Sequence, residues 1–218
     1  MKNVRYAIVA FIALGAGPVC ACDGQIGKVI FEDTFEDDSG GWDLSPPNTI
    51  IKPPNLLISL SEGSTPGNSN AYSAQQLTFR AKDADYCVEG TIPKALAPDN
   101  NFVLGLEFWA ADYRNYWLAQ VDSGGTATVW INANGGWTNV AKVVNAPGFK
   151  PAGANALRVV TLGGKVVVYL NGQLVKTIRA PLPDDALRFG IYGAVDKAVD
   201  AMPAIQVNSF KVTTGTKS

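Results

Sequence analysis

The chain has 218 residues, a length that suits one domain better than two. Hydrophobic residues make up 47% and charged residues 17%, which is typical of a compact globular domain and excludes a disordered chain. The 18 basic residues are offset by 19 acidic ones, so there is no positive surplus with which to bind nucleic acid. There is no histidine, which excludes Ser-His-Asp and Cys-His catalysis and imidazole metal sites.

The N-terminus has the pattern of a bacterial secretory signal. Lys2 and Arg5 give a positive start, residues 6–17 form an apolar run, and small residues follow before Asp23. The apolar run is too short for a comfortable membrane span. We therefore expect residues 1–21 to be removed and the protein to be exported, to the periplasm, the envelope or the medium. Without Lys2 and Arg5 the chain keeps 16 basic against 19 acidic residues, a net charge of −3.

Two processing routes fit the residues around the cleavage site. A general signal peptidase would cut after Ala21. The run Val19-Cys20-Ala21-Cys22 also resembles a lipobox, in which Cys22 carries a lipid anchor and becomes the first mature residue. If Cys22 is lipidated, Cys87 is a single buried thiol. If Cys22 is not lipidated, a Cys22–Cys87 disulfide becomes possible outside the cytoplasm.

The mature chain is predicted to be all-β. From residue 28 onward, short apolar or alternating runs recur between Gly, Pro, Asn and Asp, as in a sandwich or barrel. Residues 22–28 are expected to be a short tether, residues 29–213 one domain, and residues 214–218 a tail. The expected strands are 29–35, 48–51, 56–61, 71–79, 85–92, 102–109, 115–121, 126–131, 138–144, 156–161, 165–170, 174–179, 187–193 and 204–212. Only residues 71–82, which lack Gly and Pro, could also form a helix.

Glycine-rich turns mark reversals of the chain. Asn171-Gly172 lies between two β-rich runs, and this dipeptide supplies the positive φ angles of a type I′ hairpin. Gly163-Gly164 and Gly124-Gly125 indicate two more reversals.

Several segments resemble a known superfamily in their order along the chain. They read FEDTFEDDSGGWD, NYWLAQVDSGG, TVWINANGGW, NALRVVTLGGKVVVYLNGQLV, LRFGIYG and IQVNSFKV. In this order they are similar to the laminin-G-like domains of the concanavalin A-like lectin/glucanase superfamily, over about residues 29–213. The resemblance implies a jelly-roll sandwich of two antiparallel sheets, one of them concave. Members include lectins, adhesion modules and glycan-cleaving enzymes, and a bacterial family that acts on 3-keto-glycosides shares the scaffold.

Catalytic motifs are missing from this sequence. The glucanase branch carries a Glu-x-Asp-x-Glu strand, which places two carboxylates on one sheet face. Glu32-Asp33 and Glu36-Asp37-Asp38 have the wrong spacing for it and indicate a solvated acidic turn. We therefore expect no catalytic residues and no cofactor. Calcium binding is a secondary hypothesis, with Asp112 and Asp122 as ligands; their alternative role is as solvent-exposed turn residues.

Successive side chains of a strand point to opposite faces of the sheet, and this alternation indicates a binding surface. In the run FVLGLEFW, Phe102 and alternate residues suit the core, so Val103, Gly105, Glu107 and Trp109 share the other face. The same reasoning on other strands predicts an open face on the concave sheet. Its residues are Glu89, Glu107, Gln120, Trp130, Arg188 and Tyr192.

This mixture of aromatic, amide and charged groups suits a sugar, because rings stack on pyranose faces and planar polar groups bind hydroxyls. We expect an exported, monomeric, non-catalytic module that binds carbohydrate or a cell-envelope glycan and meets a membrane only through lipid on Cys22. One alternative is a glycan- or keto-glycoside-acting hydrolase that uses Glu89 and Glu107 on neighbouring strands. Another is an adhesion module that binds protein. A third interpretation of the face is structural, with Glu107 and Arg188 as an ion pair.

Overall fold

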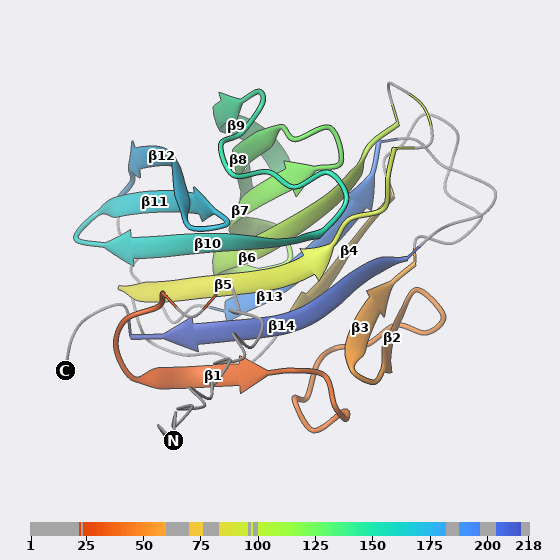
Figure 1. Cartoon of the computed structure of the whole chain (residues 1–218). Coiled ribbons are helices and arrows are strands. Elements are labelled where there is room, and N and C mark those ends of the chain that lie inside the picture. The colour runs from red at the N-terminus through yellow and green to blue at the C-terminus, as the bar shows by residue number, and fades with distance from the viewer. Residues whose placement is uncertain are drawn as a thin grey trace, which may run out of the picture.

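The computed structural model describes residues 22, 24–59, 70–75, 83–95, 97, 100–181, 188–196 and 204–214, of which residues 70–75 are described by their backbone only. All regular structure in these residues is β-strand, and each expected strand overlaps one that is observed (Figure 1). The all-β prediction is confirmed. Residues 76–82, the rest of the ambiguous segment, lie outside the described residues. Within the described part of the chain, no helix is long and apolar enough to cross a membrane.

One sheet has eight strands. Its path runs through β12, β11, β10, β5, β14, β3 and β2, and β1 pairs with β14. Each of its neighbouring strand pairs is antiparallel. The bounds are β12 Gln173–Arg179, β11 Lys165–Leu170, β10 Ala154–Leu162, β5 Ala84–Thr91, β14 Ile205–Thr213, β3 Asn55–Ile58, β2 Thr49–Lys52 and β1 Val29–Asp33.

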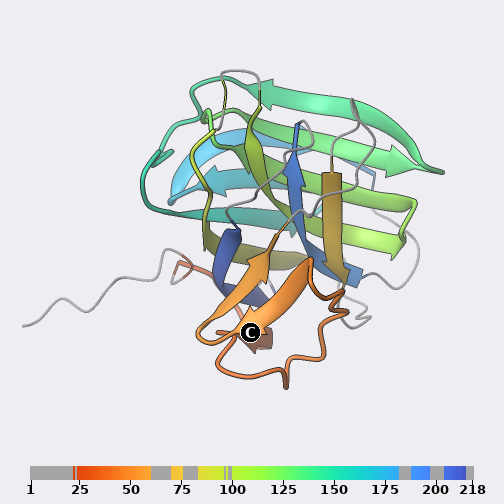
Figure 2. The same ribbon diagram turned by 90° about the vertical axis from the view of Figure 1, so that its right-hand side faces the viewer.

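The second sheet has six antiparallel strands in the order β4, β13, β6, β7, β8 and β9. The bounds are β4 Asn70–Gln75, β13 Arg188–Val195, β6 Phe102–Asp112, β7 Asn115–Asp122, β8 Ala127–Ala133 and β9 Gly136–Val143. Figure 2 shows β4 beside β13 at one edge of this sheet. Strands β6 to β9 form a meander, in which each strand pairs with the next along the chain.

The core lies between the two sheets. Alternate residues of facing strands supply one contiguous set of buried apolar side chains. At its centre the rings of Phe189 and Phe210, one from each sheet, stack with centroids 5.3 Å apart. Trp42 meets Phe210 edge-on at 5.3 Å. Two antiparallel sheets that enclose one core make the predicted jelly-roll sandwich.

The predicted hairpin turns are present. Asn171 and Gly172 have φ angles of 49° and 78°, and the pairing of Leu170 with Gln173 leaves only these two residues in the loop. Gly163-Gly164 closes the β10–β11 hairpin in the same way.

Trp109 was expected on the outer face, and this prediction is wrong. Its φ of 50° and a register shift between Phe108 and Asp112 turn the ring inward. The indole then packs edge-on against Trp117 in the core, with centroids 5.8 Å apart. A bulge changes the face that the following residue occupies, and parity alone cannot show a bulge.

Candidate functional site

The outer face of the six-stranded sheet carries several of the predicted residues. Tyr192 of β13 pairs with Gly105 of β6, which in turn pairs with Gln120 of β7. Trp130 of β8 is opposite Leu118 of β7, one row further along. Because Gly105 has no side chain, Tyr192 and Gln120 stand on either side of a bare stretch of β6.

A groove with a cavity volume of about 240 Å³ hollows this face. Three of the six predicted residues line it. The described residues that line it are Val103, Leu118, Gln120, Trp130, Trp137, Tyr192, Ala194 and Asp196. It combines aromatic rings, an amide and one carboxylate, the groups that recognise sugar hydroxyls and pyranose faces.

Two aromatic rings of the groove lining, Trp130 and Trp137, contact each other, and Trp137 also contacts Tyr116. Trp137 meets Trp130 edge-on at a centroid distance of 6.3 Å and Tyr116 edge-on at 5.5 Å. The Trp130 indole Nε1 donates to Thr128 Oγ1 over 3.0 Å, which fixes the ring plane. Trp137 remains 46% exposed, so its face is available for stacking.

Among the described residues that line the groove, Asp196 supplies the one charged side chain. Its Oδ2 accepts hydrogen bonds from the backbone N and the Nδ2 of Asn101, both over 3.2 Å. A return bond from Asp196 N to Asn101 O completes the link. The carboxylate is therefore held at the rim, where it can accept hydrogen bonds from hydroxyl groups.

Gly105 lets the groove take its shape. A Cβ placed there would lie 2.8 Å from Leu118 Cδ1 and 3.1 Å from Cβ and Cδ1 of Tyr192. Two lining side chains therefore close over β6 only because position 105 has no side chain.

Glu107 lies on the predicted face, but it is not on the surface of the groove. It is 0% exposed, and its β-sheet neighbours are Leu118 and Gly190. The alternation of side chains along the strand predicted the correct face for Glu107. At Glu107, however, this face is buried and not open to solvent.

Burial raises the pKa of two tyrosines on the same face. The pKa of Tyr116 is raised to about 12, first by desolvation and then by the negative charge of Glu107. The pKa of Tyr192 is raised as well, again chiefly by desolvation, with Tyr116 and Glu107 adding to it. Both phenols therefore stay protonated at neutral pH and can donate hydrogen bonds.

Arg188 lies at the opposite end of β13 from Ala194, which lines the groove. It pairs with Ala110, close to the β6–β7 turn. Tyr113 on that turn donates to Asp43 Oδ2 over 3.0 Å. This bond is the largest cause of the raised pKa of Tyr113. The positive charge of Arg188 lowers that pKa, and the negative charge of Glu107 raises it.

The predicted place of Glu89 is wrong. It belongs to β5, which lies between β10 and β14 in the eight-stranded sheet. Glu89 and Glu107 therefore belong to different sheets, and the hypothesis that they lie on neighbouring strands is wrong. Parity assigned Glu89 correctly to an outer face but could not tell which sheet holds the strand.

Asp112 and Asp122 stand at opposite ends of β7 rather than around one point. Asp112 Oδ1 accepts the backbone N–H of Arg114, and Asp122 Oδ1 accepts those of Gly124 and Thr126. Both carboxylates organise turns. In the described residues no three acidic, Cys or His side chains form a group that could hold a metal ion.

Trp137 and Asp196 were missed by the sequence analysis, although both carry a usable signal. Asn134-Gly135 is a two-residue hairpin, and counting outward from it pairs Asn132 with Trp137. Asp196 extends the outward alternation of Tyr192 and Ala194 by one step beyond β13.

Comparison with known proteins identifies the fold. No family model and no curated sequence matches the chain. Among solved structures, an endo-β-1,3-glucanase of Pyrococcus furiosus superposes with a TM-score of 0.62 and 13% identity over 87% of this chain and 95% of that one. A β-glucanase of Bacillus licheniformis gives 0.60 and 14% over 87% and 99%. The carbohydrate recognition domain of Emp46p gives 0.59 and 13% over 84% and 92%. These matches confirm the predicted fold, a sandwich of two antiparallel sheets.

Proposed function

We propose that this protein is an exported, non-catalytic module that binds neutral carbohydrate in the groove of its six-stranded sheet. The observation that carries the proposal is the groove itself, which places the exposed ring of Trp137 on one side and the Gln120 amide and Asp196 carboxylate within the same hollow. An aromatic platform beside hydroxyl-binding groups is suited to a sugar ring.

The size and charge of the groove define the ligand further. Its volume of about 240 Å³ is below the roughly 300–1,000 Å³ of sites that enclose a drug-sized ligand, so one end of a glycan fits better than a long enclosed segment. Asp196, the one charged side chain among the lining residues that are described, is negative. An anionic sugar would meet like charge there, whereas a neutral or amino sugar would not.

The similar folds support a carbohydrate ligand without deciding between binding and cleavage. Two of the matched structures are glucanases and one is a carbohydrate recognition domain, and one fold can serve both roles. Glycoside hydrolysis by the common route requires two carboxyl groups facing one bond. Of the carboxylates in the part of the chain that the structure describes, Asp196 alone lines the groove, while Glu107 is 0% exposed. This arrangement favours binding.

The test is a glycan screen followed by titration of the best ligand against the wild type and single variants. Trp137→Ala removes the exposed ring and Gln120→Ala removes the amide; each is expected to weaken binding about tenfold or more, or about 1.4 kcal/mol. Leu174→Ala is the matched control, because Leu174 is 55% exposed on edge strand β12 of the other sheet.

Retained affinity in both groove variants would contradict the assignment of the site. Release of product from the bound glycan, abolished by Asp196→Asn, would instead establish an enzyme. The thermal unfolding of each variant is measured alongside, since Trp137 and Gln120 lie outside the sandwich core and their removal should leave Tm nearly unchanged.

A further inference from the structure

We infer that Cys22 of the mature protein is joined to Cys87 and is therefore not the site of a lipid anchor. The two cysteines form a disulfide that links the N-terminal segment to the central strand β5. Cys22 is 2% exposed and Cys87 0%, and both pack against Ala156 of β10. This inference does not depend on what the groove binds.

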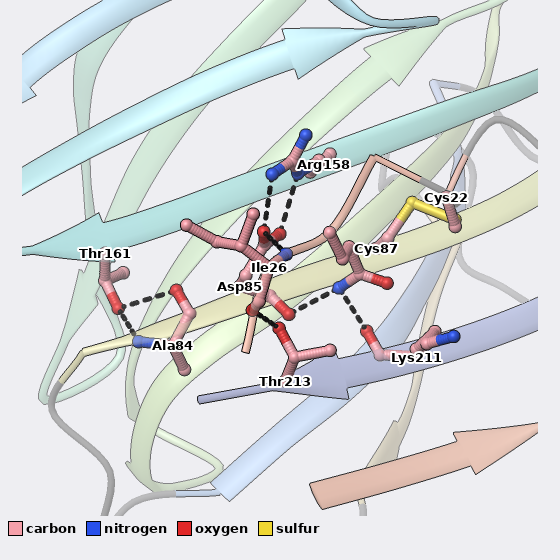
Figure 3. A network of polar contacts seen from close by, with 10 residues as sticks. Cys22, Ile26, Ala84, Asp85, Cys87, Arg158, Thr161, Lys211 and Thr213 are labelled. Carbon is pink, nitrogen blue, oxygen red and sulfur yellow. Dashed lines mark hydrogen bonds and ion pairs between the residues drawn. A yellow bond between two sulfur atoms is a disulfide. The ribbon is translucent and has the colours of Figure 1, made fainter. Parts of the chain in front are cut away.

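The segment that follows Cys22 is part of the fold rather than a tether. We call Cys22 together with residues 24–28 the N-terminal strap. Gln25 Nε2 donates to the backbone oxygens of Asp85 and Lys211, over 2.5 and 3.2 Å, and so bridges β5 and β14. Thr213 Oγ1 donates to Ile26 O (Figure 3). Lys28 and Thr214 exchange two further hydrogen bonds of 3.1 and 2.9 Å.

The strap also closes over a buried ion pair. Asp85 is 0% exposed and accepts both Nε and Nη2 of Arg158, over 2.8 and 2.5 Å. The backbone N of Ile26 approaches the same carboxylate at 3.4 Å (Figure 3). The disulfide, the Gln25 bridge and this contact all fix the strap to the eight-stranded sheet, away from the groove.

Lipidation of Cys22 and its disulfide with Cys87 are mutually exclusive. A lipid anchor requires a thioether on Cys22 Sγ, and the disulfide uses the same sulfur. Disulfide formation removes one proton and one electron from each of the two thiols. The acceptor is a protein disulfide of an oxidising extracytoplasmic compartment, which becomes a dithiol. Cleavage after Ala21 by a general signal peptidase, with release of an unanchored protein, is the route consistent with this bond.

The experiment expresses the full chain in a bacterial host and measures the intact mass of the protein recovered from envelope and medium. The expected product begins at Cys22, carries no lipid and is two hydrogen atoms lighter than the dithiol. Iodoacetamide should add nothing before reduction and two groups after reduction and unfolding. A mass increase equal to a diacylglycerol, or two thiols that alkylate without reduction, would overturn the inference.

A matched pair of variants supplies a second readout. Cys22→Ser and Cys87→Ser should behave alike, because each removes the same bond: both should still be processed and recovered without lipid, with an equal fall in Tm. Under lipidation the two would differ, since only Cys22→Ser would lose the anchor and leave the membrane fraction, and that asymmetry would also refute the disulfide.

Discussion

Among individual residues, Asp85 shows how much depends on a carboxylate that is buried beneath the N-terminal strap. Its two oxygens are held by Arg158, whose guanidinium also lies over the ring of Tyr169 at 5.4 Å. Removing one partner of a buried pair leaves the other charge without compensation.

Asp85→Asn is therefore expected to lower the free energy of unfolding by on the order of 3 kcal/mol, measured by urea denaturation. Glu32→Gln is the matched control. Glu32 pairs with Lys211 over 3.1 Å but is 49% exposed, so its loss should cost less than about 1 kcal/mol. Equal losses in the two variants would mean that the burial of Asp85 does not set the strength of its pair.

Tyr116 and Tyr192 give stability a dependence on high pH. Their pKa values are raised in the folded state, so the unfolded chain loses its phenolic protons first. The stabilisation is complete below the unfolded pKa of about 10 and is lost as pH rises through the folded value.

The Tm of the wild type should accordingly fall between about pH 10 and 12. Tyr192→Phe, which has no proton to lose, should show a smaller fall over the same range. The measurement is thermal unfolding at a series of pH values, and an identical slope in both proteins would contradict the role given to Tyr192.

Glu107 and Glu89 show the limit of parity for single residues. Alternation placed both on outer faces, and the structure agrees. Parity carries no information on whether neighbouring side chains cover a position, as they do at Glu107. It also cannot report which strands share a sheet, because β5 pairs with β10 and β14, which are distant in sequence.

At the scale of elements, the β11–β12 hairpin depends on Asn171 for more than its backbone angle. Asn171 Nδ2 donates to Gly148 O and Asn155 Oδ1, and its Oδ1 accepts Ala156 N, all within 2.8–2.9 Å. The hairpin turn is thereby joined to the loop before β10.

Asn171→Ala removes these bonds and places Ala at a positive φ, so we expect a loss of about 3 kcal/mol in chemical denaturation. Asn171→Gly keeps the backbone angle available and should cost about half as much. If the two variants were equally destabilised, the side-chain bonds would account for the whole effect and the φ angle for none of it.

Local patterns were the most predictable feature of the strands. Asn171-Gly172 and Gly163-Gly164 fix short hairpins through residues adjacent in sequence, and these predictions are confirmed. Trp109 could not be placed because regular alternation does not hold across the register shift between Phe108 and Asp112, beyond which its ring packs against Trp117. The order of strands within a sheet likewise depends on contacts between distant segments.

For the whole molecule, the two-sheet sandwich was predictable from strand spacing and from the resemblance, whereas the site was only partly so. Gln120, Trp130 and Tyr192 line the groove, on the outer face that the alternation of side chains predicts for each of them. The groove also depends on the missing side chain at Gly105 and on Asp196 at its rim. Their contribution cannot be predicted without knowing which strands pair with which. The sequence predicts a tether for residues 22–28, because the partners of the strap, Asp85 and Lys211, lie far along the chain.

The disulfide between the strap and β5 also determines how the protein responds to mechanical load. A pull on the N-terminus reaches Cys22 first and passes through its sulfur to Cys87, so the segment between them, which spans a sequence separation of 65, cannot be drawn out. At about 3.4 Å per residue, that withholds roughly 220 Å of extension. The shielded stretch includes β1, which otherwise would peel from β14 one bond at a time. Tension is delivered instead to the middle of the eight-stranded sheet, and the groove on the opposite sheet lies outside the path of the force.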